Sequence, residues 1–404
     1  MMLDRNNMNV AQIVGLYLPL TQTFIYEYLR KVKRFRSEVF TEEIHNLDLF
    51  PLGSINLVKR TGAEKVIDKI LKPFAGHQIL HDLKYLNLFG KKKIGLIHAH
   101  FGWNAVRMLT IKGKMDIRLV TTFYGADMSV LPNQAYYKVA YQELFETGDL
   151  FLVEGNNMQN DLARLGCPRE KIRIQHIGID LDKFNSKTRT SVNEDETTII
   201  LMCSSFVEKK GIEIGIQAFE RALDYFKNIE LHIIGDGILR KKLEDLIKDL
   251  RIDGKVKLFG YQNHEFYRAE LNKAQIFMAP SFTASDGDSE GGAPTVLIEA
   301  QASGLPILST YHADIPEVVL DGTSGFLVPE KDIDALAEKL LLLLEHPELR
   351  RKMGLAGREH VEKNYNIFHE AGKLEQVYCE LLEAPSVNMV EEDSLEKLGG
   401  KNWI

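Results

Sequence analysis

The chain has 404 residues, of which 45% are hydrophobic and 26% are charged, and its formal net charge is −7. This length exceeds what one hydrophobic core usually supports, and the composition excludes a disordered or fibrous protein. We therefore expect two globular domains.

The first residues carry Asp4 before a short apolar run, without the basic head and small-residue cleavage site of a signal peptide. No apolar run reaches the roughly 20 residues that cross a bilayer. Cys167, Cys203 and Cys379 lie far apart and are odd in number, which favours reduced thiols over a disulfide framework. These features predict a cytoplasmic protein.

Charge is distributed unevenly along the chain. Residues 1–185 hold 25 Lys and Arg against 19 Asp and Glu, and the remainder is strongly acidic. The basic residues form clusters interleaved with apolar ones: Lys31, Lys33, Arg34 and Arg36; Lys59, Arg60, Lys65, Lys69 and Lys72; Lys91, Lys92 and Lys93. This pattern suits either peripheral contact with an anionic membrane surface or an ordinary solvated helix face. We expect no nucleic-acid partner.

Short apolar runs rich in β-branched residues alternate with amphipathic segments along the chain. We expect strands at 11–17, 94–98, 119–123, 150–153, 172–176, 198–203, 230–234, 256–259, 276–279 and 307–309, and helices that include 212–226, 240–249 and 333–345. Such alternation is typical of parallel sheets with helices on both faces. The sequence therefore predicts an α/β protein of two doubly wound, Rossmann-like domains facing across a cleft.

We place the first domain at 1–185 and the second at 186–365, because the polar run 180–197 has little apolar periodicity and suits a linker. Residues 385–404 are predicted to form a frayed tail. In open α/β sheets, ligands bind at the carboxyl ends of the strands, so the loops that follow strands should carry the function.

Three loops of the first domain end probable strands: 18–25, 96–102 and 121–129. His98 and His100 point the same way from one strand, but no third zinc ligand lies nearby, so a polar cleft or a satisfied core position is favoured. Asn156 and Asn157 are expected to cap the helix that follows them.

In the second domain, the stretch 286–294 follows a strand and precedes a helical pattern that we expect to begin at Pro294. Gly291, Gly292 and Ala293 would place backbone N–H groups and the positive end of a helix at the carboxyl edge of the sheet, which suits a phosphate. Asp286 and Asp288 have the Asp-x-Asp spacing of some metal sites, but the later ligands of a calcium loop are missing, so an Asx turn is favoured and no metal is expected.

The segment EGGAPTVLIEAQASGLPIL, residues 290–308, resembles the donor-binding signature of retaining GT-B glycosyltransferases of family 4. The resemblance implies that Glu290 and the residues after it contact the hexose of the donor, and that Glu299 binds the ribose. Eight residues separate the two acids instead of the usual seven. A one-residue bulge must therefore be absorbed at 291–293.

The stretch 204–219 resembles the phosphate-binding segment of the same family, with Lys210 at the lysine that holds the donor diphosphate. Ser205 stands where the family usually has arginine, so Lys209 or another basic residue must compensate, or catalysis is weakened. The remaining implied donor contacts are Gly235 and Gly237 in the nucleotide pocket, Gly260 and Tyr261 at the nucleobase or in a structural turn, and Pro294 and Thr295 at the helix start.

The first-domain loops resemble the acceptor side of the family. The implied positions are Thr21, Thr23, His100, Gly102, Tyr124, Gly125 and Asp127. Tyr124 replaces a frequent His and cannot act as a base near neutral pH. By the same resemblance, a helix at 366–382 crosses back onto the first domain.

The resemblance implies metal-independent transfer of a hexose-type residue from a nucleotide diphosphate sugar to a glycan or lipid-linked acceptor, with retention of configuration. Lys210 and Glu290 would be the catalytic residues, and no cofactor is needed beside the nucleotide sugar, which is a co-substrate. A nucleotide-sugar epimerase of the same fold is one alternative. A catalytically weakened nucleotide-sugar-binding protein is another, and it is motivated by Ser205 and the altered spacing after Glu290.

Overall fold

The computed structural model describes residues 9–19, 22–64, 66–67, 70, 79–184 and 197–383. Several predicted features lie outside these residues: Thr21, Lys65, Lys69, Lys72, most of the linker and the tail 385–404.

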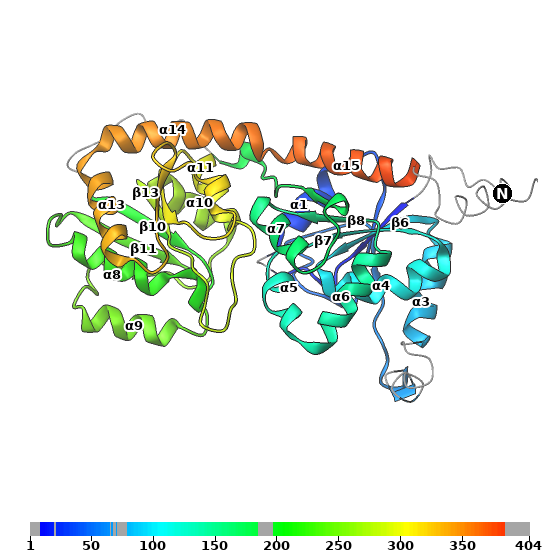
Figure 1. The fold of residues 1–404 in the computed structure, drawn as a ribbon. Helices are drawn as coiled ribbons and strands as arrows, with labels where there is room; N and C mark the ends of the chain where they lie inside the picture. Colours follow the sequence, from blue (N-terminus) through cyan, green and yellow to red (C-terminus); the bar gives the residue numbers. More distant parts are fainter. Residues whose placement is uncertain are drawn as a thin grey trace, which may run out of the picture. The chain divides into compact units, whose positions relative to one another are not determined.

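The first sheet has seven strands in the order β5-β3-β1-β6-β7-β8-β9 (Figure 1). Neighbouring strands from β5 to β8 pair in parallel. The strands are β1 (Asn9–Ile13), β3 (Ser37–Thr41), β5 (Ile55–Leu57), β6 (Ile94–His100), β7 (Arg118–Thr122), β8 (Leu150–Val153) and β9 (Ile172–Ile174). Two short strands, β2 (Leu16–Tyr17) and β4 (Glu43–Ile44), pair separately.

The helices that accompany this sheet are α1 (Thr23–Lys31), α3 (Ile79–Lys91), α4 (Gly102–Met115), α5 (Ala126–Ser129), α6 (Ala135–Thr147), α7 (Asn156–Arg164) and α15 (Ile367–Glu383). The C-terminal helix α15 is tied to this sheet by Tyr378. Its hydroxyl hydrogen-bonds with His98 Nδ1 at 2.6 Å and accepts from Gln12 Nε2 at 3.2 Å. A helix distant in sequence is therefore anchored to two neighbouring strands, β1 and β6.

The second sheet has six strands in the order β12-β11-β10-β13-β14-β15, all paired in parallel. They are β10 (Thr198–Cys203), β11 (Ile229–Ile234), β12 (Val256–Leu258), β13 (Ile276–Ala279), β14 (Ile307–Thr310) and β15 (Gly325–Val328). Numbered within this sheet, the order is 3-2-1-4-5-6, the Rossmann arrangement, which reverses direction between the first and fourth strands. The reversal therefore falls between β10 and β13.

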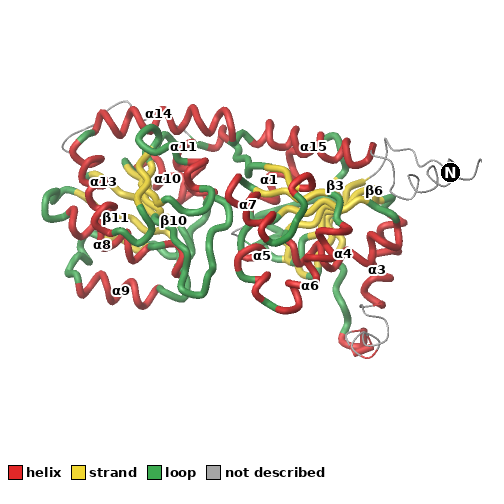
Figure 2. The backbone as a smooth tube through the Cα atoms, viewed as in Figure 1, coloured by secondary structure: helices red, strands yellow, loops and turns green. Residues whose placement is uncertain are grey.

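Helices cover both faces of the second sheet (Figures 1 and 2). They are α8 (Ile212–Ala222), α9 (Arg240–Asp249), α10 (His264–Lys273), α11 (Thr295–Ala302), α12 (Ile315–Val318), α13 (Ile333–Glu345) and α14 (Pro347–Asn364). One core contains apolar residues of α8, α9 and α13, and the other contains residues of α10 and α11. Alternate strand residues point to opposite faces, so the nearly continuous apolar strands supply both cores.

The described residues form two compact units. The first unit comprises the described parts of 1–123, 139–152 and 371–404, and the second comprises those of 124–138 and 153–370. The domain boundaries at 1–185 and 186–365 stay predictions.

The α/β class and the doubly wound parallel sheets are confirmed. The expected strand at 11–17 is interrupted and becomes β1 and β2, and the helix expected at 212–226 ends at Ala222 because a turn begins at Leu223. Strands β3, β5 and β15 were not expected. Within the described residues, no helix combines the length and the apolar character that a membrane crossing requires.

We predict that Gly354→Ala lowers the stability of the protein. A Cβ at this position in α14 would lie 2.0 Å from the carbonyl oxygen of Gly304, in the turn after α11, so the helix and the turn must separate. Such overpacking usually costs about 1–3 kcal/mol. Urea unfolding followed by circular dichroism should show a lower midpoint.

Gly113→Ala is the matched control, because Gly113 is an exposed position in α4 where a Cβ would meet nothing within 4 Å. It should be neutral or raise stability by about 0.5–1 kcal/mol. An unchanged midpoint for Gly354→Ala would contradict the close packing of α14 on the turn.

Candidate functional site

The candidate site lies where the strand order of the second sheet reverses. The loop after β10 carries Lys209 and Lys210, and the loop after β13 carries Asp288 and Glu290. Lys210 Nζ lies 2.6 Å from Glu290 Oε2, and Lys209 Nζ lies 3.0 Å from Asp288 Oδ1. The reversal point is where open α/β sheets bind ligands. The structure thus brings together the two residues predicted to be catalytic.

A glycine permits this approach of the two loops. Residues Glu208–Lys210 form one turn of 3-10 helix, which ends at Gly211 in the left-handed conformation (φ 64°). A Cβ on Gly211 would lie 2.0 Å from the carbonyl oxygen of Pro280. The contact between the two loops therefore requires the absence of a side chain at this position.

The carboxylate of Glu290 is almost fully buried and held from several sides. It accepts a hydrogen bond from Ser281 Oγ at 2.7 Å in addition to the ion pair with Lys210. Burial alone would raise the pKa of Glu290, but Lys210, Lys209 and Ser281 together hold that pKa below its usual value. The side chain is therefore a fixed, ionised acceptor.

Residues 291–293, where the extra residue was predicted to be absorbed, lead into α11. Gly291 adopts a left-handed conformation (φ 76°), which a glycine tolerates without strain. Helix α11 begins at Thr295, and Pro294 is its N-cap with ψ 127°, so the predicted start at Pro294 was one residue early. The backbone N–H groups of Thr295 and Val296 make no hydrogen bond to any described part of the chain, and both residues are partly accessible.

The Asp-x-Asp stretch forms the expected Asx turn. The backbone N–H of Asp288 donates to Asp286 Oδ1 at 2.9 Å. The Asp288 carboxylate is also paired with Lys209, whose ammonium donates to the Ser289 carbonyl oxygen at 2.8 Å. In this structure the Lys209 ammonium is held by the 288–289 loop, and its predicted compensation for Ser205 stays a prediction.

Glu299 lies inside α11 with partial access to solvent. Burial raises its pKa to about 7, and the Tyr267 hydroxyl, Lys183 and Arg268 oppose that rise. Glu299 therefore gains or loses its proton near neutral pH.

The remaining predicted donor residues lie in the loops after β10, β11 and β12. A Cβ on Gly235 would lie 1.8 Å from the Ser204 carbonyl oxygen, and one on Gly237 would lie 2.8 Å from the Phe206 carbonyl oxygen. Packing between these two loops thus accounts for both glycines. Gly260 has a left-handed conformation (φ 70°) and its carbonyl accepts from the Gly235 N–H, and Tyr261 is exposed. Ser205 is half-buried. Their contacts with a nucleotide stay predictions.

The loop after β7 meets the Glu290 loop through its backbone. A Cβ on Gly125 would lie 2.8 Å from the Glu290 carbonyl oxygen, and one on Gly291 would lie 2.6 Å from Gly125 Cα. Asp127 is fully buried and accepts from the N–H groups of Tyr124 and Gly125 at 3.1 and 2.9 Å. Asp127 therefore shapes this turn, and the turn lies beside Glu290.

The other predicted acceptor-side residues lie in the first unit. His100 is buried and hydrogen-bonds with Gln12 at 3.0 Å, and burial lowers its pKa to about 3. A Cβ on Gly102 would lie 2.4 Å from the Tyr141 hydroxyl. His100 and Gly102 are therefore core positions in this structure. For His100 this agrees with the predicted alternative of a satisfied core histidine. Thr23 is half-buried at the start of α1, and Thr21 lies outside the described residues.

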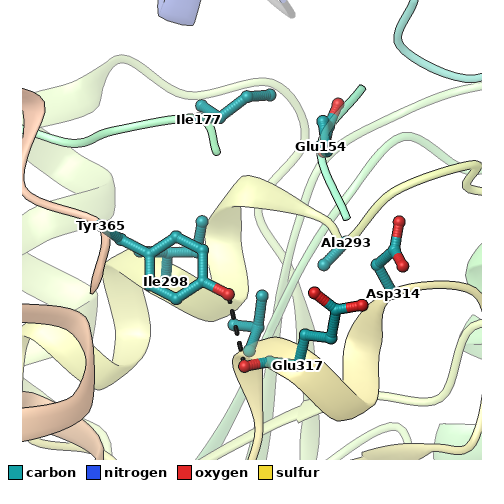
Figure 3. Close-up of a pocket in the computed structure, with 8 residues that line it drawn as sticks. Glu154, Ile177, Ala293, Ile298, Asp314, Glu317 and Tyr365 are labelled. Atoms are coloured by element: carbon teal, nitrogen blue, oxygen red, sulfur yellow. Dashed lines mark hydrogen bonds between the residues drawn. The ribbon is translucent and has the colours of Figure 1, made fainter. Parts of the chain in front are cut away.

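Three carboxylates surround a small cavity beside α11, drawn in Figure 3: Glu154 after β8, and Asp314 and Glu317 after β14. Glu317 accepts from the N–H of Asn156 at 2.7 Å, and Asp314 accepts from those of Asn157 and Met158 at 2.6 and 3.3 Å. These acids therefore cap α7. The prediction that Asn156 and Asn157 are its caps was wrong, because both lie inside the first turn and Gly155 is the N-cap.

Glu154, which lines this cavity, packs against the glycine loop, residues 291–293. Its carboxylate accepts from the Ala293 N–H, and a Cβ on Gly292 would lie 2.2 Å from Glu154 Oε2. Burial, followed by the carboxylates of Asp314, Asp127 and Glu290, raises the pKa of Glu154 well above its usual range. Burial likewise raises the pKa of Asp314 to about 7. The loop that carries Glu290 thus packs against an acid whose pKa is raised by burial and by neighbouring carboxylates.

Sequence reasoning missed Glu154, Asp314 and His312. His312 Nε2 accepts the Glu290 N–H at 3.2 Å, and His312 Nδ1 lies 2.7 Å from Glu330 Oε1. Glu154 directly follows β8, and His312 and Asp314 lie in the loop and turn after β14. A search of every loop that follows a strand would therefore have found them.

Two family models match adjoining parts of the chain. The model described as Glycosyltransferase Family 4 matches residues 28–183, and the model described as Glycosyl transferases group 1 matches residues 184–360. Together they cover residues 28–360, which hold the second sheet, the first sheet except β1, and the loops that carry Lys210 and Glu290.

Two curated relatives are similar over part of their length. The putative colanic acid biosynthesis glycosyltransferase WcaL of Escherichia coli is 34% identical over 273 residues, and the amylovoran biosynthesis glycosyltransferase AmsK of Erwinia amylovora is 37% identical over 274 residues. Each match spans 66% of this chain and 66% of the relative, just under two thirds.

Solved structures share the fold. HepE of Anabaena, in complex with UDP and glucose, has a TM-score of 0.75 at 15% identity and covers 92% of this chain and 100% of its own. A glycosyltransferase from Rickettsia africae has a TM-score of 0.76 at 18% identity and covers 94% of this chain and 100% of its own. The fold is the two-domain GT-B type, and the chain belongs to the family 4 glycosyltransferases.

Proposed function

We propose that the protein transfers a hexose-type residue from a nucleoside diphosphate sugar to a glycan or lipid-linked acceptor in polysaccharide biosynthesis, with retention of the anomeric configuration. The observation that carries this proposal is the pairing of Lys210 with Glu290 at the carboxyl ends of β10 and β13. The names of the relatives WcaL and AmsK support polysaccharide biosynthesis, and the UDP and glucose bound to HepE support the class of donor.

The difficult step is departure of the diphosphate. The bond between the anomeric carbon and the phosphate oxygen breaks, its electron pair stays with the diphosphate, and the sugar acquires oxocarbenium character. Lys210 and the accessible N–H groups at the start of α11 supply fixed positive potential for that leaving group. The acceptor hydroxyl oxygen forms the new bond to the anomeric carbon, and an oxygen of the departing phosphate accepts the proton of that hydroxyl, as the family resemblance implies.

The Lys210–Glu290 ion pair can couple binding of the donor's diphosphate to binding of the donor's sugar. Before the donor binds, Lys210 is neutralised by Glu290. A diphosphate competes for the ammonium and leaves the Glu290 carboxylate to accept hydrogen bonds from sugar hydroxyls. Because a lysine and backbone amides carry the charge of the leaving group, the proposed transfer needs no metal ion.

Incubation with donor alone distinguishes the proposed transferase from an epimerase. Donor incubated without any acceptor should be hydrolysed slowly with the same sugar released, whereas an epimerase would return donor with an altered sugar. Measurable nucleotide affinity without turnover of donor would instead favour the binding protein.

A charge change at Lys210 tests the role of the ammonium. Lys210→Ala should lower kcat about 10²–10³-fold at saturating donor, corresponding to about 2.7–4 kcal/mol of transition-state stabilisation. The donor is first chosen by thermal shift with UDP, GDP and ADP and their hexose derivatives, because binding to the folded state raises its apparent stability. Lys242→Ala is the control, because Lys242 is exposed and forms an ion pair with Glu213 at the surface. A wild-type kcat for Lys210→Ala would rule out the proposed role.

Titration of Glu299 predicts that nucleotide affinity depends on pH. A ribose hydroxyl donates its hydrogen bond to the ionised carboxylate, and the pKa of Glu299 is about 7 without ligand. Below pH 7 binding must expel a proton, so Kd should rise up to about tenfold for each pH unit lowered. Calorimetry between pH 5.5 and 8.5 measures the slope. Glu299→Gln should bind more weakly and lose this step; a variant that keeps the wild-type slope would refute the ribose assignment.

We also propose that the protein makes peripheral contact with an anionic membrane surface, at the cytoplasmic face of the membrane. Exposed apolar residues lie in the same stretch as the exposed Lys59: Leu57, Val66, Ile67 and Ile70. Apolar and basic side chains together favour an anionic lipid surface.

Co-sedimentation with vesicles tests this contact. Vesicles with anionic lipid should bind the protein at low salt, and Lys59→Glu should weaken the binding at least about fivefold, since each basic residue contributes roughly 1 kcal/mol. Lys241→Glu, an exposed lysine of the second unit, is the control. Equal binding to neutral vesicles, or no effect of salt, would remove this part of the proposal.

A further inference from the structure

A pocket of about 200 Å³ lies beside the Glu290 loop and is separate from the Lys210 pair. All of its walls belong to the second unit. Ser289 and Gly291 form one wall, Met128 and Ser129 of α5 form another, and the end of α7 forms the third with Asp161, Arg164 and Leu165. A pocket of this volume has room for several water molecules and is large enough for a polar ring.

The place of the pocket relates it to the transferred sugar. Ser289 and Gly291 flank Glu290, which the proposed function puts on the donor hexose. For transfer, the acceptor hydroxyl must come within about 3–3.5 Å of the anomeric carbon. The acceptor sugar unit that receives the transferred sugar must therefore lie next to the Glu290 loop. The two sequence neighbours of Glu290 line this pocket.

The charges around the pocket cancel in pairs. Arg164 forms an ion pair with Asp161, which also accepts from Asn157 Nδ2 at 3.1 Å. On the opposite side, Asp288 is neutralised by Lys209 at 3.0 Å. A phosphate or a uronate in the pocket would meet the carboxylate of Asp161 together with the guanidinium of Arg164, with no net positive charge to hold it. The charge pattern favours a neutral ligand.

The groups on the walls suit sugar hydroxyls. Asp161 accepts and Arg164 donates, side by side, so adjacent hydroxyls of a ring can bind both. Ser129 and Ser289 add hydroxyl groups: Ser129 Oγ donates at 3.3 Å to the Gly125 carbonyl, and Ser289 Oγ accepts at 3.3 Å from the Gly291 N–H. Met128 and Leu165 are apolar and can pack against the C–H face of the ring. A few placed polar groups on an apolar lining are typical of small-molecule sites.

We propose that the pocket between α5, the end of α7 and the Glu290 loop binds the terminal neutral sugar residue of the acceptor, and that Asp161 and Arg164 recognise its hydroxyls. This inference rests on the proposed function and narrows it: the sugar is transferred to a saccharide and not directly to the phosphate of a carrier. A phosphate-bearing carrier would lie beyond the terminal sugar, outside the pocket.

Saturation-transfer NMR with simple glycosides tests the proposal on the full chain. The probes are methyl α-D-glucoside, methyl α-D-galactoside and methyl α-D-mannoside, each added to protein saturated with the nucleoside diphosphate that stabilises it most. At least one glycoside should receive saturation from the wild-type protein. Arg164→Leu and Asp161→Asn should each weaken that binding about tenfold or more, and Arg164→Lys should restore part of it.

Arg169→Leu is the matched control, because Arg169 is an exposed arginine near the end of α7 that contacts Asn160 and does not line the pocket. It should bind the glycoside as the wild type does. Leu165→Trp should block the pocket by filling it, which gives a second variant with unaltered charge. The nucleoside diphosphate is titrated into every variant first, and a variant that does not bind it is treated as misfolded. If Arg164→Leu fails this check, Leu165→Trp takes its place, and the reverse.

The outcomes separate the two proposals. If the wild-type protein binds no nucleoside diphosphate, the proposed function fails. If it binds the nucleotide but the glycoside signal is absent, or is equal in Arg164→Leu, Leu165→Trp and the wild type, the pocket assignment is overturned and the function stands. Inorganic phosphate that displaces the glycoside at equal concentration would show an anion site instead, and would also overturn the proposal.

Discussion

The close approach of the loops after β10 and β13 is the constraint on which the site depends. It requires a residue without a side chain at Gly211, because a Cβ there would lie 2.0 Å from the Pro280 carbonyl oxygen. The approach holds the Lys210 ammonium 2.6 Å from the Glu290 carboxylate, in surroundings that exclude most water. An opposite charge at this distance outweighs the cost of burying Glu290, so the acid stays ionised.

Other acids of the second unit have a raised pKa, whereas the pKa of Glu290 is lowered. Among the residues that the structure describes, Glu154 has no ammonium partner, and burial with three neighbouring carboxylates raises its pKa well above the usual range. Asp314 and Glu299 are also raised, each to about 7, chiefly by burial. The site therefore combines an ionised acid beside Lys210, an acid with a raised pKa against residues 291–293, and two acids whose pKa is about 7. Environment alone distinguishes these chemically similar groups.

Local sequence patterns located most of the framework. The strands at 150–153, 198–203 and 276–279 and the helices at 240–249 and 333–345 agree with β8, β10, β13, α9 and α13 at both ends. Their apolar periodicity is a property of neighbouring residues, so it can be recognised without a structure. Strands β3, β5 and β15 are short or mixed in polarity, and only pairing with their neighbours identifies them.

The sequence by itself determined the alternating α/β order, the loops that follow the strands, and the glycines, Lys210, Glu290 and Glu299 within them, because such patterns are local. Only the tertiary structure decided which charges meet and which acids keep their protons. Asn157 and Asp314 are 157 positions apart, yet the carboxylate of one caps the helix of the other, where the sequence predicted a local cap. Burial and pairing depend on residues brought together by the sheet order, and no local pattern encodes that order.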